Sequence, residues 1–130
     1  MVTITASNPD GVHPPVSSYA HAALVEGAGR RLVISAQVGV APDGSVSPDA
    51  GRQMDQVFAN LGAVLAAHGM TPRDVVKLSA FLTGRLLITP WRIRRDAWLG
   101  GHTAAATLLL VSGFADPRFV VEVEAEAVAN

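Results

Sequence analysis

Three glutamates near the C-terminus have a spacing that could support acid–base chemistry. Glu122, Glu124 and Glu126 alternate with apolar residues, so in a β-strand their carboxylates share one face. A solvated strand face is the ordinary reason for such a pattern. If the face instead lined a cleft inside an oligomer, burial and mutual repulsion would raise the carboxyl pKa values towards the range of a general base. Both interpretations stay open for Glu122, whereas a solvated position is preferred for Glu126.

Two hydroxyl groups could orient a substrate beside such a base. Tyr19 is the only tyrosine and follows a polar loop, which allows its hydroxyl group to face a cleft. The alternative is a tyrosine packed in the core with its hydroxyl group bonded internally. Ser35 lies within an apolar segment, where its hydroxyl group needs a partner. That partner is either a backbone carbonyl group, which is the commoner case, or a ligand.

Other kinds of site lack their sequence signatures. The chain contains no cysteine, which excludes disulfides and a thiolate nucleophile. Its four histidines are scattered without an HExxH motif or an i, i+4 pair, so we expect no metal site. Nucleotide-binding glycine motifs and the G-x-S-x-G motif are also absent, and we expect no cofactor.

Charge and hydropathy limit the partners. A net charge of −1 over 130 residues gives no strong attraction for nucleic acid or an anionic membrane. The N-terminus does not resemble a signal peptide, and the longest apolar stretch, near residues 104–111, is too short to cross a bilayer. We therefore expect a soluble cytoplasmic protein. Because 49% of residues are hydrophobic and only 16% are charged, part of its surface is expected to be covered in an oligomer.

Hydrophobic periodicity and turn residues predict the elements that position these side chains. Strands are expected over residues 2–6, 19–26, 31–40, 74–83, 107–111 and 119–128. In the fourth strand, Val76 is expected on the same side as the buried leucines. One helix is predicted from its N-cap Ser47 to Gly69, and a second from its N-cap Thr89 to Gly100. Arg94 and Arg95 are expected on a solvated face of the second helix, pairing with Asp96 or a neighbouring subunit.

The order β-β-β-α-β-α-β-β predicts one α+β domain over residues 1–130. A largely antiparallel six-stranded sheet with both helices on one face is the economical arrangement. The other face then needs cover, which association between copies would supply. The pattern by itself does not choose between two copies and three.

Five segments resemble motifs of the RidA/YjgF family, in family order and at family spacing. Residues 14–22 resemble the motif P-x-GPYSQA, and residues 32–38 resemble the strand V-F-V-SGQ-I/V. Residues 60–69 and 74–83 are similar to NL-x-x-VL-x-x-x-G and DVVK-x-x-x-x-LT, and residues 121–128 resemble VEIEA-x-AV. Each motif alone is a weak signal, whereas five in order are a strong one.

The resemblance implies a chorismate-mutase-like fold and a homotrimer with a cleft for a small anionic metabolite between its subunits. The archetypal activity is hydrolysis of reactive enamines and imines, released by pyridoxal-phosphate enzymes, to 2-oxo acids and ammonia. The family's catalytic tyrosine, serine and glutamate fall on Tyr19, Ser35 and Glu122.

The family's carboxylate-binding arginine has no counterpart at its usual place. Its P-A-R-T/S motif corresponds to residues 104–107, which puts Ala106 where the guanidinium group belongs. Thr107 and Leu108 are the expected neighbours in the substrate site. The family often has an asparagine in the second helix, lining the same cleft, and this sequence has Arg92 there. We hypothesise that Arg92 supplies a relocated cation for an anionic ligand.

Three functions follow from this comparison. The first is hydrolytic deamination of enamines or imines resembling 2-aminoacrylate, with an altered substrate range. The alternative is a trimeric metabolite-binding or regulatory module without catalysis, which the loss of the arginine favours. A ribonuclease activity, also attached to the family, fits poorly with the near-neutral charge.

Overall fold

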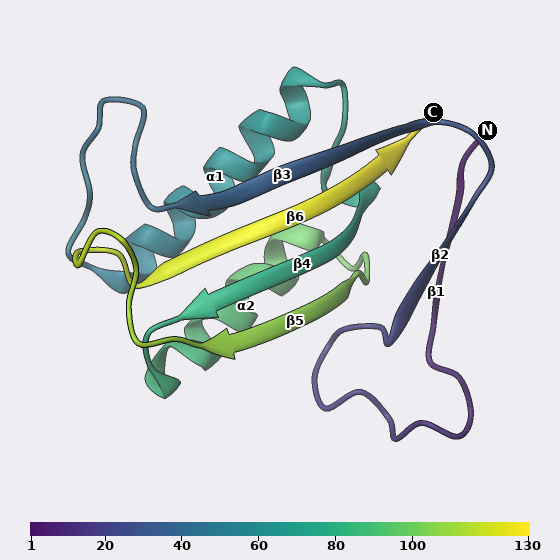
Figure 1. The fold of residues 1–130 in the computed structure, drawn as a ribbon, viewed down its shortest axis with the longest axis horizontal. Coiled ribbons are helices and arrows are strands. Elements are labelled where there is room, and N and C mark those ends of the chain that lie inside the picture. Colours follow the sequence, from purple (N-terminus) through teal and green to yellow (C-terminus); the bar gives the residue numbers. More distant parts are fainter.

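The computed structural model describes residues 1–130, and its elements follow the expected order (Figure 1). The strands are β1 (Thr3–Ser7), β2 (Ala22–Glu26), β3 (Arg30–Val38), β4 (Val75–Leu82), β5 (Ala105–Leu110) and β6 (Val121–Ala129). The helices are α1 (Ala50–Ala67) and α2 (Ile88–Leu99), with short 3-10 helices η1 (Pro72–Asp74) and η2 (Arg85–Leu87). No helix combines the length and apolar character needed to cross a membrane.

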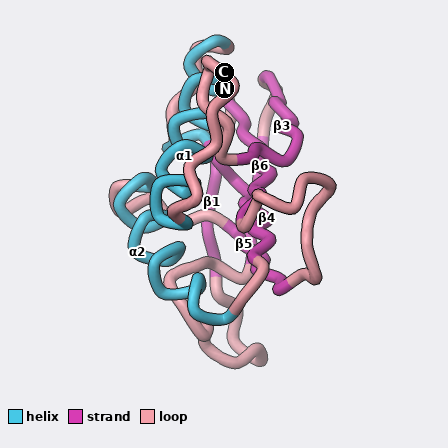
Figure 2. Tube along the Cα trace, turned by 90° about the vertical axis from the view of Figure 1, so that its left-hand side faces the viewer, coloured by secondary structure: helices cyan, strands magenta, loops and turns pink.

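The α+β class is confirmed, and both helices cover one face of the main sheet (Figure 2). The prediction of one six-stranded sheet is wrong. Four strands form a sheet in the order β3-β6-β4-β5, in which only β4 and β5 are parallel, and β1 pairs with β2 in a separate ribbon. The chain turns between β2 and β3 at Gly27, which has a φ of +91°. A Cβ atom there would collide with Met1 O, so this turn requires glycine. This turn carries the ribbon away from β3.

The side chains of the inner strand β6 show that the two faces of the main sheet differ chemically. Val121, Val123 and Ala125 are buried against the helices, and the glutamates between them point to the opposite face, which carries no helix. We call that second face the open face. The alternation predicted for this strand is confirmed.

One buried position of β4 was predicted wrongly. Val75 is fully buried and Val76 is only half-buried. The pairing of β4 with β6 shifts between Val75 and Lys77, and such an irregularity changes which side chain faces the core. Leu78 and Leu82, beyond the shift, are buried as expected.

The helices end as predicted but begin at other residues. Gly69 and Gly100 adopt the left-handed conformation after α1 and α2. The N-cap of α1 is Asp49, whose Oδ1 accepts from Gly51 N at 2.8 Å, so the prediction of Ser47 is wrong. Thr89 is not the N-cap of α2, because η2 runs directly into this helix and leaves Thr89 inside its first turn.

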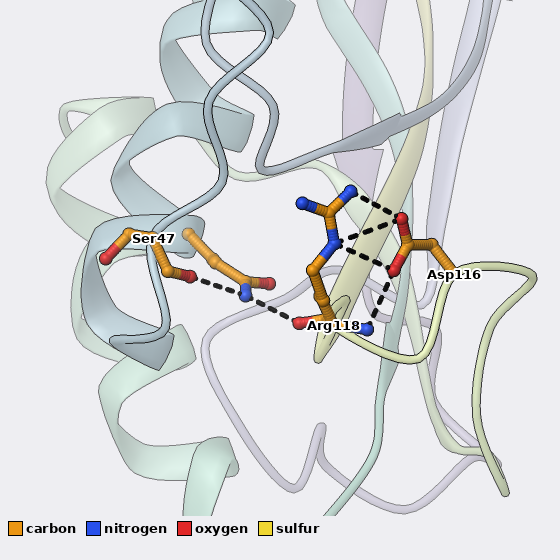
Figure 3. Close-up of polar contacts among 4 residues, drawn as sticks. Ser47, Asp116 and Arg118 are labelled. Atoms are coloured by element: carbon orange, nitrogen blue, oxygen red, sulfur yellow. Dashed lines mark hydrogen bonds and ion pairs between the residues drawn. The ribbon is translucent and has the colours of Figure 1, made fainter.

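A buried amide fixes the loop that leads into β6. Gln53 Nε2 donates to the carbonyl oxygens of Ser47 and Arg118 at 2.9 and 2.8 Å, and Gln53 Oε1 accepts from Val120 N at 3.0 Å. On the solvent side, Arg118 Nη2 pairs with Asp116 Oδ2 at 2.7 Å (Figure 3). Hydrogen bonds from Arg118 lower the pKa of Asp116 to about 2. These contacts set where the alternating part of β6 begins.

Candidate functional site

A pocket of about 220 Å³ lies between α2, strands β4 and β5, and the loop that precedes β2. Trp91 of α2 lies in its wall and stacks on Phe58 of α1, with ring centroids 4.9 Å apart. Because Trp91 is only 1% exposed, this wall is fixed by core packing. The position of α2 is therefore set by the core, and its pocket-lining side chains are held with it.

The sheet supplies an apolar wall. Ala106 and Leu108 of β5 pair in register with Leu78 and Ala80 of β4, and all four line the pocket. Thr107 also lines the pocket and pairs in register with Ser79 of β4. Its Oγ1 atom, however, accepts a hydrogen bond from Lys77 Nζ at 2.8 Å. Thr107 therefore offers its hydroxyl group to the open face and not to the apolar wall.

The loop before β2 covers the pocket and brings Tyr19 to it. Ala20 N donates to Ala104 O at 3.1 Å and ties the loop to the edge of β5. Tyr19 lines the pocket together with Val16 and Ser17. Its hydroxyl oxygen accepts from Val16 N at 3.3 Å. Because the hydroxyl group acts only as an acceptor in this bond, its hydrogen can still be donated to a ligand.

Arg92 is the unpaired cation of the pocket. It lines the cavity and is half-buried, and its Nε atom is buried without any hydrogen-bond partner. None of the four ion pairs in the structure involves Arg92. A buried donor without an acceptor costs free energy, and an anion in the pocket would remove that cost.

Arg95 also lines the pocket and is only 4% exposed, so the prediction of a solvated position for Arg95 is wrong. The expected pairing with Asp96 is present, with Arg95 Nε 3.1 Å from Asp96 Oδ1. Arg95 Nη2 reaches Ser17 Oγ and Ser18 Oγ, each at 3.4 Å. The helix turns Arg95 inwards because it lies four residues after the buried Trp91.

Ser35 and Glu122 lie apart from this pocket. Ser35 is exposed on β3, next to the buried Ile34 and at an irregularity in the pairing with β6. Glu122 pairs with Phe81 across β4 and β6 and alternates with buried residues, so it points to the open face. Burial raises the pKa of Glu122 above its ordinary value. Of the predicted residues, one chain thus brings together Tyr19, Arg92, Ala106, Thr107 and Leu108, but neither Ser35 nor Glu122.

Replacing Glu122 is expected to change the pH dependence of stability. In wild type, the raised pKa means that stability falls as pH rises from the ordinary value of 4.5 through the value in the folded protein. Glu122→Gln removes this loss because an amide does not ionise. The variant should match wild type near pH 4.5 and become relatively more stable as pH rises, measured by urea unfolding. A Glu122→Gln protein that loses stability relative to wild type on raising the pH would contradict the assignment. Exposed Glu124→Gln is the control.

Two larger side chains of the pocket, Trp91 and Arg95, are not among the predicted site residues. Arg95 was expected only as a solvated surface charge. The signal that could have found them is their spacing from each other, which puts both on one helix face beside Arg92. No group of three or more histidine, aspartate or glutamate side chains gathers in an arrangement that could hold a metal ion.

Comparison with known proteins identifies relatives of this chain. A family model described as "Endoribonuclease L-PSP" matches residues 11–129. The RutC family protein YjgH of Escherichia coli is 37% identical over 83 residues, which cover 64% of this chain and only 63% of that relative.

Solved structures are similar over almost the full length. The protein YyfB of the conserved Rid family from Yersinia pestis, described as of unknown function, superposes with a TM-score of 0.86 at 31% identity and covers 97% of this chain and 98% of its own. RidA from an Antarctic Psychrobacter species has a TM-score of 0.74 at 25% identity and covers 96% and 99%.

Proposed function

This chain belongs to the RidA/YjgF family, whose members act on small molecules. We propose that it binds a small anionic imine or enamine and hydrolyses it. The observation that carries the proposal is the buried, unpartnered Nε atom of Arg92 in a pocket with Tyr19. A guanidinium group presents two parallel donors to a carboxylate, and in a half-buried site such a pair is strong and directional. Arg92 thus takes over the role that Ala106 cannot fill.

The complete site forms between two copies of the chain. Arg92 and Tyr19 lie on the helix side of the sheet, and Glu122 and Ser35 lie on the open face. The sheet itself separates the two pairs, so no movement of side chains within one chain can join them. In the proposed homotrimer, the pocket edge of one subunit meets the open face of the next.

In this cleft each group has a distinct task. Arg92 binds the carboxylate of a 2-imino acid, and the hydroxyl groups of Tyr19 and Ser35 orient it. Glu122 accepts a proton from a water molecule, whose oxygen adds to the carbon of the C=N bond, and Glu122 then returns that proton to the imine nitrogen. In the resulting carbinolamine the hydroxyl proton is transferred to the amino nitrogen, the C–N bond breaks, and ammonia departs, leaving a 2-oxo acid. The raised pKa of Glu122 moves this carboxyl group towards the range useful for a general base.

A second candidate is a binding module that keeps the pocket and has lost catalysis. One observation favours it, namely that the pocket within one chain contains no carboxylate side chain that could activate water. The two candidates share the anion site and differ only in whether Glu122 of another copy completes it.

An imine assay tests the proposal and separates the two candidates. An amino-acid oxidase generates 2-imino acids in the reaction mixture. The rate of 2-oxo acid release in the presence of the protein is compared with the spontaneous rate. We expect acceleration by wild type and a loss of about 10- to 100-fold in Arg92→Ala, because a charge-assisted pair to the substrate is removed. The matched control is Arg94→Ala, since Arg94 lies on the same helix but pairs with Asp55 at 2.8 Å.

Two outcomes would change the proposal, and one further variant tests it. Equal rates for Arg92→Ala and wild type would contradict the role of Arg92. Saturable binding of 2-oxo acids without any acceleration would favour the binding module. Arg92→Lys should recover part of the affinity, because it keeps the charge and loses the planar pair of donors.

A further inference from the structure

We infer that Asp96 determines the charge selectivity of this pocket, so that it accepts a ligand with one negative charge and disfavours one with two. The inference rests on the proposed function, because it concerns the same anion site. It adds a specificity-determining residue that does not itself line the pocket.

The balance of charges is the first reason. Two guanidinium groups, of Arg92 and Arg95, line the cavity. Only Arg95 has a carboxylate partner, Asp96 Oδ1 at 3.1 Å. One uncompensated positive charge therefore remains, on Arg92, and one carboxylate of a ligand neutralises it. A second carboxylate would enter beside Arg95 and meet the negative charge of Asp96, which disfavours binding.

The geometry of Asp96 is the second reason. Its Oδ2 atom accepts a hydrogen bond from Ser18 Oγ at 3.0 Å while Oδ1 binds Arg95. Both carboxylate oxygens are thus fixed, one to the helix and one to the loop that covers the pocket. Although the Asp96 side chain is 47% exposed, these two partners hold its charge at the edge of the cavity.

Arg95 keeps donors that a ligand could use if Asp96 were neutral. Its Nη2 contacts with Ser17 and Ser18 are 3.4 Å long, at the weak end of hydrogen bonding. A carboxylate oxygen would be a stronger acceptor than either hydroxyl group. The cavity of about 220 Å³ suits a small metabolite of a few carbon atoms better than a drug-sized ligand.

Two probes of equal chain length test the inference, 2-oxopentanoate with one carboxylate and 2-oxopentanedioate with two. Their dissociation constants are measured by calorimetry with wild type, Asp96→Asn and the control Asp55→Asn, which alters an acidic residue paired with Arg94 instead. We expect wild type and Asp55→Asn to prefer the monocarboxylate by at least about tenfold. Asp96→Asn should bind the dicarboxylate about tenfold more tightly than wild type does, with little change for the monocarboxylate.

Each remaining outcome has a defined meaning. If the monocarboxylate binds and Asp96→Asn leaves the ratio of the two constants unchanged, the inference is overturned and the anion site stands. If neither probe binds wild type, or if Arg92→Ala binds the monocarboxylate as well as wild type does, both the anion site and the inference are overturned. Ser18→Ala gives a second variant should Asp96→Asn not fold, because it releases Asp96 Oδ2; it should shift the ratio in the same direction by a smaller factor.

Discussion

Mixed oligomers of Arg92→Ala and Glu122→Gln chains are expected to hydrolyse imines faster than either variant does alone. Each variant destroys a different half of the proposed cleft. In a mixed oligomer, some clefts join the intact Arg92 of a Glu122→Gln chain to the intact Glu122 of an Arg92→Ala chain. The physical reason is the position of the two residues on opposite sides of one sheet.

The size of the recovery can be estimated. With random mixing of equal amounts, about a quarter of the clefts contain both intact residues, so about a quarter of the wild-type rate should return. The two proteins are unfolded together in urea and refolded, and 2-oxo acid release is measured as above. Refolding each variant separately and then combining them at a low temperature is the control, since subunits that do not exchange should show only the residual activity of the two variants. Wild type refolded in the same way is the positive control. If it regains activity and the mixture does not, the proposed cleft between two copies is contradicted.

Gln53→Leu is expected to cause the largest loss of stability of any single polar replacement in this chain. Gln53 is 1% exposed, and its amide bonds three backbone groups, those of Ser47, Arg118 and Val120. Leucine would leave these groups without partners in a buried place, at about 1 kcal/mol or more each. We therefore expect the free energy of unfolding in urea to fall by at least about 3 kcal/mol.

A neighbouring amide provides the control for this prediction. Gln56 lies on the same helix, is half-buried and makes one side-chain bond, to Asn60 Oδ1 at 2.8 Å. Gln56→Leu should cost less than about 1 kcal/mol. Equal losses for the two variants would show that helix propensity and side-chain size, not the three backbone bonds, determine the effect. Because Gln53 fixes the start of β6, Gln53→Leu should also disturb the position of Glu122.

The features of the fold that follow from periodicity were predictable. The alternation along β6 separates Glu122 from buried Val121 and Val123, and the regular apolar spacing identified α1. Local competition between hydrogen bonds was harder to predict. Asp49 and Ser47 are both good N-cap residues, and the choice of Asp49 depends on where Gln53 anchors the preceding loop.

The candidate site was predictable in its residue types and less so in its arrangement. Tyr19, Arg92 and Ala106 were recognised from motif positions, and the structure gathers them around one cavity. Arg95 looked like a surface charge because its sequence neighbours are polar. Its burial results from the packing of Trp91 against Phe58, a contact between two helices that no local pattern encodes.

The sequence by itself determined the class of fold, the order of the elements, the family and the absence of an arginine at position 106. Spacing along one strand or one helix is enough for the elements, because a period of 2 or 3.6 residues fixes which side chains share a face. The family and the missing arginine follow instead from the resemblance of five segments to family motifs. Only the tertiary structure decided that Arg92 lacks a partner, that Arg95 is neutralised by Asp96, and that Glu122 lies across the sheet from Arg92. Those facts depend on which faces of different elements meet, and that is set by packing between segments far apart in the chain.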